Sequence, residues 1–228
     1  MKKFLSTLLA LLMLLSLAAC AEEATTVYVS ISDDTGALVL AYQPVALTDA
    51  DGDGALTICD ALMNAHIAYH PNGADAFVAE PSEWGLSLYV LWGVDNGGSY
   101  GYCLNDASAM SLLDPIQPGD HVKAYAYTDL TTWSDTYTFF DATDVAAAVN
   151  SEVALTLFAN SYDENWNPVT CLVQGAVLVV DGEVYDDVVT DANGQFVLSF
   201  AEAGVYTVSA MSNDLPLVPP VCIVTVTE

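Results

Sequence analysis

The feature that most constrains this chain is a series of short stretches in which apolar and polar residues alternate. They are rich in Val, Tyr, Thr and Leu, and Gly, Asn, Asp or Pro residues bound them. Alternation with a period of two places the apolar side chains on one face of a strand, so the chain predicts a mostly β fold. The stretches are TTVYVSI, ALVLAYQPV, LSLYVLWGV, HVKAYAYT, TYTFF, EVALTLFA, AVLVVDG, QFVLSF, VYTVSAM and CIVTVT.

One segment has the pattern of a helix. From Ile58 to about Tyr69 the apolar residues give an imperfect helical face, and Thr57 and Asp60 have the spacing of a capping box. The other boundaries are turn signals, which are DDTG at 33–36, Asp181-Gly182 and Asn193-Gly194.

These elements predict two domains. Strands mixed with one helix indicate an α+β domain over 27–140, whereas after Glu152 every element has a strand pattern at the short spacing of an Ig-like β-sandwich over 152–228. Between them, DATDVAAAVNS at 141–151 is interpreted as a linker or a short helix.

The N-terminal residues predict export. Residues 1–19 have two lysines, a Leu-rich run and then small residues, which is the order of a signal peptide. Leu17-Ala18-Ala19-Cys20 at 17–20 resembles a bacterial lipobox, so we expect lipidation of Cys20 and a short tether over 20–26. The alternative is ordinary cleavage at the same small residues, which would release a soluble protein.

The charge balance excludes one class of partner. Removal of the signal leaves Lys123 as the single basic residue against 30 acidic ones. Such a chain is expected to bind no nucleic acid, to contact a membrane only through its lipid anchor, and to attract cations.

The loop TDADGDGALTICD at 48–60 carries the most specific chemistry. Calcium takes six to eight oxygen ligands, and a short loop supplies them only if the chain turns sharply. Counting from Asp49, acidic side chains fill positions one, three and five, and Gly54 at position six permits the turn. The predicted ligands of calcium loop 49–60 are Asp49, Asp51, Asp53, the Ala55 carbonyl, Thr57 and Asp60.

This ligand order is similar to that of EF-hand and dockerin loops, with two departures. Asp60 replaces the usual Glu at position twelve, and a strand pattern rather than a helix precedes the loop. A single loop of this kind indicates a structural calcium site rather than a sensor. The alternative is a solvated acidic turn without an ion.

Other candidate sites are less specific. His66 and His70 have the four-residue spacing of zinc ligands, but two partly exposed histidines are the simpler interpretation. The chain has no arginine, no Gly-x-Ser-x-Gly motif and no phosphate loop, so we expect no enzyme activity. Cys171 and Cys222 are interpreted either as a disulfide in the C-terminal domain or as free thiols.

A cluster of aromatic residues has two alternative interpretations. It forms either a platform for a sugar or a planar ligand, or part of the core and edge packing. The residues of this cluster are Trp84, Tyr89, Trp92, Tyr100 and Tyr102. Gly97 and Gly98 would let a ligand approach the backbone. The loop Tyr162 to Trp166 is interpreted as an exposed loop rather than a site.

Two resemblances complete the interpretation. LTICDALMNA, GGSYGYCLNDASA and IQPGDHVKAYAYT resemble the transcobalamin-C-terminal-like domain of bacterial surface proteins, which implies a β-grasp-like α+β fold. The segment VQGAVLVVDGEVYDDVVTDANGQFVLSFAEAGVYTVSA resembles Ig-like or transthyretin-like surface modules, which implies a spacer or binding platform. The first resemblance identifies no residue of this chain that would bind a corrinoid.

The expected function is that of a lipid-anchored bacterial surface protein with calcium as its cofactor, acting as a ligand-binding or adhesion module for an unknown protein, glycan or small molecule. The alternatives are a carrier of a corrinoid or sugar and a calcium-stabilised structural spacer.

Overall fold

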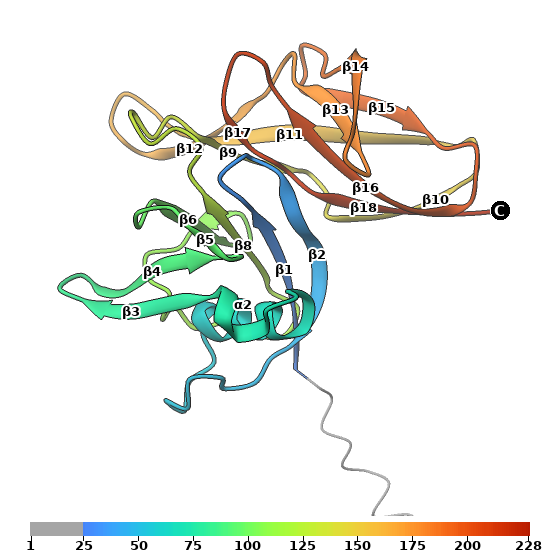
Figure 1. Cartoon of the computed structure of the whole chain (residues 1–228). Coiled ribbons are helices and arrows are strands. Elements are labelled where there is room, and N and C mark those ends of the chain that lie inside the picture. The colour runs from blue at the N-terminus through green and yellow to red at the C-terminus, as the bar shows by residue number, and fades with distance from the viewer. Residues whose placement is uncertain (1–24) are drawn as a thin grey trace, which may run out of the picture.

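The structure, a computed structural model, describes residues 25–228 and has two lobes, each built on its own β-sheets (Figure 1). The predicted signal peptide, the lipobox and Cys20 lie outside the described residues. The predicted fold class is confirmed: the chain is mostly β with one main helix, an α+β β-grasp-like part first and an Ig-like β-sandwich second.

The sheet of the N-terminal lobe begins with an antiparallel hairpin. Strands β1 (Thr26–Ser32) and β2 (Leu38–Ala46) pair across the predicted turn, where Gly36 takes a positive φ of 78°. Strand β8 (His121–Ala126) then pairs with β1 in parallel. The spatial order is β2-β1-β8-β6-β7, with β6 at Tyr100–Leu104 and β7 at Ala107–Ser108.

The helix α2 spans Ile58–Tyr69, which confirms the predicted helix. It packs across β1, β2 and β8 and covers one face of the sheet (Figure 1). Its buried apolar residues include Ile58 and Leu62, which join Val29, Ile31 and Val122 of the strands in one core. Burying such side chains contributes about 1.5–3 kcal/mol each.

A second, smaller sheet extends from this lobe. It consists of β3 (Val78–Ser82), β4 (Gly85–Leu91) and β5 (Val94–Asp95), and a short 3-10 helix, Gly73–Ala76, connects it to α2. Its inner residues Leu88 and Leu91 belong to the same core, whereas the β3–β4 hairpin reaches away from the lobe (Figure 1).

The C-terminal lobe is a sandwich of two layers. One sheet has the order β10-β18-β16-β13-β14, and the other has the order β12-β11-β9-β17 with β15 also paired to β11. Phe196, Leu155 and Val224 lie in the core between them. The strands are β9 (Thr136–Phe140), β10 (Asp144–Ala148), β11 (Glu152–Tyr162), β12 (Pro168–Leu172), β13 (Val177–Val180), β14 (Glu183–Val189), β15 (Gln195–Ser199), β16 (Gly204–Met211), β17 (Leu217–Val218) and β18 (Cys222–Thr227).

The structure differs from the predicted linker at 141–151. This segment contains β10, which pairs in parallel with β18, and Val145 and Ala147 pack against the sandwich core. Strand β9, which the predicted boundary assigned to the first domain, pairs with β11 and β17. The three consecutive alanines favour a helix locally, but alternating burial against the neighbouring sheet overrides that preference.

The two lobes meet at a buried junction around Lys123 of β8. Its ammonium group donates to the carbonyl of Thr138 at 2.9 Å and to that of Pro219 at 3.4 Å, and it lies 4.5 Å from the centre of the Tyr137 ring. All three partners belong to the C-terminal lobe. Burial lowers the pKa of Lys123 to about 8, although Asp106 and Cys103 act in the opposite direction.

Further polar bonds close the same junction. The Tyr137 hydroxyl donates to Asp106 Oδ1 at 2.7 Å, and the Asn160 amide donates to the Asp106 carbonyl at 2.8 Å.

Within residues 25–228, no helix has the length and apolar character needed to cross a membrane.

Gly101 on β6 is the tightest glycine at this junction. It lies opposite Tyr125 of β8, and a Cβ added to it would lie 2.1 Å from the Tyr125 ring. Tyr125 is itself buried in the junction cluster with Tyr137 and Val218, so its ring has little room to move.

We therefore expect Gly101→Ala to lower stability by about 1–3 kcal/mol through overpacking, measured by chemical denaturation. The control is Gly204→Ala, where the nearest atom to the new Cβ is 3.4 Å away. Equal unfolding free energies for both variants would contradict the packing described for Tyr125.

Candidate functional site

Three of the predicted calcium ligands are brought together in the loop between β2 and α2. Asp49, Asp51 and Asp53 each offer a carboxylate oxygen, and these oxygens all lie within 4.8 Å of one another. All three side chains are exposed to solvent. The structure therefore places positions one, three and five of the loop around a common point.

Backbone amides of the loop hold these carboxylates in place. Asp49 accepts from the N–H of Gly52 at 2.7 Å and of Gly54 at 3.0 Å, and Asp53 accepts from the N–H of Ala55 at 2.7 Å. Asp51 accepts from the N–H of Asp53 at 3.1 Å. Gly54 has φ +88°, a conformation that suits glycine and lets the chain turn at the sixth position.

The last two predicted ligands lie under the start of α2. Asp60 is buried, and its Oδ2 accepts from the N–H and the hydroxyl of Thr57, both at 2.9 Å. Its Oδ1 accepts from the N–H of Ala50 at 2.7 Å. The capping box is thus present, and Asp60 fastens the loop to the helix instead of joining the exposed triad.

The electrostatics of the loop reflect this crowding. The bond from the Asp53 N–H lowers the pKa of Asp51, but burial and the carboxylates of Asp60, Asp53 and Asp49 together raise it above its usual value. A cation between these groups would remove the repulsion. Leu56 packs against the core and anchors the loop.

His66 of α2 and His70, which follows the helix, do not form an open metal site. His66 is buried, which corrects the expectation that it is partly exposed, and both ring nitrogens are engaged. Nδ1 lies 2.6 Å from the Leu62 carbonyl, and Nε2 accepts from the Trp92 N–H at 2.8 Å. His66 therefore holds the β4–β5 turn, and burial lowers its pKa to about 4.

Within the aromatic cluster, Trp92 and Tyr100 contact neighbouring residues, whereas Trp84 is exposed to solvent. Trp92 packs against His70 edge to face at 4.8 Å, and the Tyr100 hydroxyl lies 2.7 Å from the carbonyl of Tyr89 and 2.8 Å from that of Val94. These contacts agree with a packing role. Trp84 is 87% exposed at the tip of the β3–β4 hairpin.

Four of the five aromatic residues nevertheless line one hollow of about 430 Å³, which we call the aromatic hollow. Its walls come from the β3–β4 turn, β4, the turn before β6, β6 itself and the loop after β7. The lining residues are Trp84, Leu86, Ser87, Leu88, Tyr89, Gly97, Gly98, Tyr100, Tyr102, Met110 and Ser111. Sequence reasoning missed Met110 and Ser111, because only the fold brings their loop opposite the hairpin.

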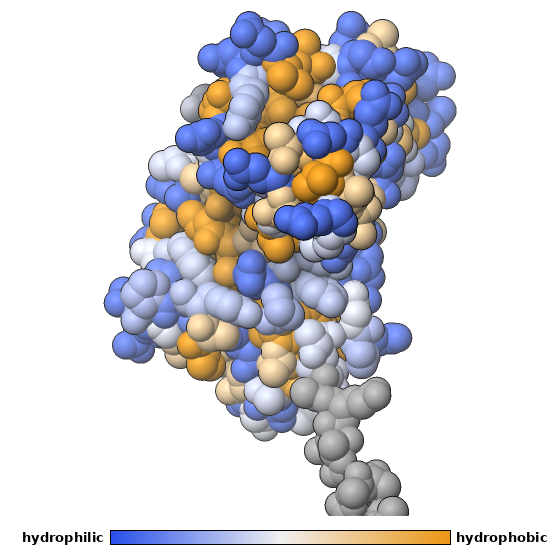
Figure 2. Space-filling model, turned by 90° about the vertical axis from the view of Figure 1, so that its right-hand side faces the viewer, coloured by the Kyte–Doolittle hydropathy of each residue, from blue (hydrophilic) through white to orange (hydrophobic). Residues whose placement is uncertain are grey.

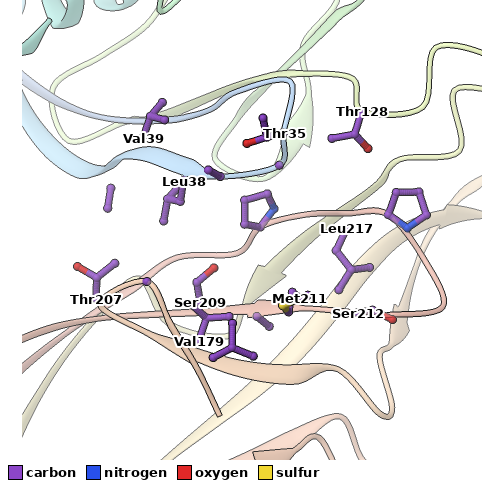
Figure 3. A pocket seen from close by; sticks show the side chains of 18 of the residues that line it. Thr35, Leu38, Val39, Thr128, Val179, Thr207, Ser209, Met211, Ser212 and Leu217 are labelled. Carbon is purple, nitrogen blue, oxygen red and sulfur yellow. The ribbon is translucent and has the colours of Figure 1, made fainter. Parts of the chain in front are cut away.

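A larger cleft of about 750 Å³ lies between the lobes (Figure 3). Leu38 and Val39 of the β1–β2 hairpin form one side, and Thr207 and Ser209 of β16 lie on the other. Figure 2 shows apolar side chains on the sandwich and in the region between the lobes. Ser209 already donates to the Pro220 carbonyl at 2.6 Å, so its hydroxyl serves the fold.

The remaining candidates are the cysteines and the loop from Tyr162 to Trp166. The described cysteines are free thiols: Cys171 is exposed on β12, whereas Cys222 is buried on β18 together with the buried Cys59 and Cys103 elsewhere. The loop Tyr162 to Trp166 is exposed, and the Asp163 carboxylate accepts from the N–H groups of Asn165 and Asn167 at 2.8 and 2.9 Å.

Comparisons with known proteins identify no family. No family model matches the chain, and no curated protein matches it. Among solved structures it is similar to the crystal structure of Dscam1 isoform 4.44, N-terminal four Ig domains, at 8% sequence identity and a TM-score of 0.25. The alignment covers 91% of this chain and 45% of that chain, so this chain spans less than half of its length.

The buried histidines predict a pH dependence of stability. Burial lowers the pKa of His66 to about 4 and that of His121 to about 3, below the usual value of 6.5. Above pH 6.5 the two imidazoles are neutral in both the folded and the unfolded state. Below pH 6.5 they each bind a proton in the unfolded chain but stay neutral in the folded chain. Stability is therefore lost as the pH falls from 6.5 toward 4.

We expect the unfolding free energy to fall by roughly 3 kcal/mol per pH unit in that range, measured by urea denaturation. His66→Gln should halve the slope, because it removes one of the two buried histidines, His66 and His121. An equal slope in wild type and His66→Gln would show that His66 titrates normally.

Proposed function

We propose that this protein is an exported, non-catalytic interaction module whose N-terminal lobe is stabilised by calcium bound in loop 49–60. Export rests on the N-terminal sequence, and anchoring rests on Cys20 in its lipobox. The observation that carries the calcium assignment is the convergence of Asp49, Asp51 and Asp53 on one point.

The distances support this ion. Calcium binds oxygen at about 2.3–2.6 Å, so two of its ligands lie at most about 5.2 Å apart. Oxygens within 4.8 Å of one another fall within that limit. A donor set made only of oxygen suits a hard cation and does not suit zinc, which favours nitrogen and sulfur.

The other predicted ligands take different parts. The Ala55 carbonyl is the expected seventh-position ligand, since Ala55 lies in the exposed part of the loop. Thr57 and Asp60 hold the loop to α2, and Asp60 Oδ1 already accepts from the Ala50 N–H. Calcium therefore connects the end of β2 to the start of the helix.

The aromatic hollow favours a second candidate function, that of a carrier for a small molecule such as a corrinoid or a sugar. The resemblance to the transcobalamin-C-terminal-like domain and the exposure of Trp84 support it. A calcium-stabilised spacer is the alternative in which the hollow has no ligand.

Calcium should raise the thermal midpoint of residues 21–228. Binding to the folded state alone adds about 2.7 kcal/mol at a free calcium concentration one hundred times the dissociation constant. The measurement is a pair of calorimetric melts, one with calcium and one with chelator. The increase should fall on the transition of the N-terminal lobe.

Asp51→Asn should abolish the calcium-dependent increase because it removes one ligand charge from the triad. The matched control is Asp187→Asn, an exposed carboxylate on β14 of the sandwich, which should retain the full increase. Equal midpoints with calcium and chelator in the wild type would reduce the loop to a solvated acidic turn.

A further inference from the structure

We propose that the aromatic hollow is a binding site for a neutral carbohydrate chain, with Trp84 and Tyr89 as stacking platforms. The inference deepens the proposed interaction function by naming the class of partner, and it does not require calcium in the loop.

The first argument is exposure. Trp84 is 87% exposed and Met110 is 90% exposed, which makes them the most exposed large apolar residues of the N-terminal lobe. They belong to segments far apart in sequence, yet both line the same hollow. Apolar side chains gathered at one exposed site, rather than scattered singly, indicate a surface that is covered by a ligand.

The second argument is the chemistry of the lining. None of the described residues that line the hollow carries a charge, although the chain is strongly acidic elsewhere. The lining instead combines aromatic rings with hydroxyl groups of Ser87, Ser111 and Tyr89. A sugar ring presents apolar C–H faces to aromatic rings and hydroxyl groups to polar ones, so the two surfaces are complementary.

The lack of a basic group decides between ligands. Lys123 is the single Lys or Arg from residue 25 to 228, and it is buried at the junction between the lobes. Phosphate, sulfate and carboxylate groups would therefore meet no cation in the hollow and would be repelled by the overall charge. A neutral saccharide avoids both costs.

The third argument is rigidity. Asn96 is buried, and its amide donates to the carbonyls of Ser99 and Tyr127, both at 2.9 Å. These bonds fix the turn that carries Gly97 and Gly98, where an added Cβ would meet nothing within 4 Å. The backbone there is thus open to a ligand and already ordered, which lowers the entropic cost of binding.

Access to the hollow is consistent with a chain rather than an enclosed small molecule. Trp84 lies in the turn between β3 and β4. This hairpin extends away from the lobe (Figure 1). Tyr89, 41% exposed, follows on β4. The volume of about 430 Å³ falls within the range of small-ligand sites, about 300–1,000 Å³, so a short part of a longer glycan would fill it.

The experiment is titration calorimetry of residues 21–228 against a panel of neutral hexasaccharides, made of β-1,4-glucan, β-1,3-glucan, α-1,4-glucan and β-1,4-mannan. We expect at least one to bind. Trp84→Ala should weaken that binding about tenfold or more, because it removes a stacking platform. The matched control, Trp166→Ala, removes an 80% exposed tryptophan of the other lobe and should leave binding unchanged.

Three results would overturn the proposal. They are no binding by any member of the panel, equal affinity for wild type and Trp84→Ala, and binding of cyanocobalamin in place of every glycan with the same dependence on Trp84. Titrations with chelator separate this site from the calcium proposal, since glycan binding is expected to persist when the calcium-dependent stabilisation is absent.

Discussion

The arrangement of the two lobes depends on the buried ammonium group of Lys123. Lys123 is buried between the lobes and donates to two carbonyls of the C-terminal lobe, while the Tyr137 ring lies against it. A buried ammonium group is costly unless its hydrogen bonds are made, so the lobes must meet with these carbonyls in place. The polar bonds of Asp106 with Tyr137 and Asn160 add to the same constraint.

Local rules were sufficient for much of the fold. The helix from Ile58 to Tyr69 has a capping box and an apolar face, and β9 and β18 are short runs rich in Thr, Val and aromatic residues, so each was predicted with its observed bounds. Strand β10 was not predicted as a strand, because its alanines favour a helix and only pairing with β18 makes it extended. Propensity fails where a neighbour distant in sequence supplies the hydrogen bonds.

The candidate site shows the same division. Asp49, Asp51 and Asp53 were identifiable because their spacing is local, and the structure brings them together. The burial of His66 was not identifiable, because its partner, the Trp92 N–H, comes from a turn that follows the whole β3–β4 hairpin. Met110 likewise reaches the aromatic hollow only through tertiary structure. Spacing predicts chemistry within a loop, whereas chemistry shared between elements requires the fold.

The burial of Lys123 also determines how the folded chain responds to trypsin, which cleaves after lysine and arginine. Between residues 25 and 228 the bond after Lys123 is the single candidate, and it lies within a paired strand at the junction. Cleavage there requires β8 to leave its neighbours. The rate of cleavage by trypsin therefore measures how often this junction opens. Local unfolding of the exposed loops does not change that rate, because these loops contain no lysine or arginine.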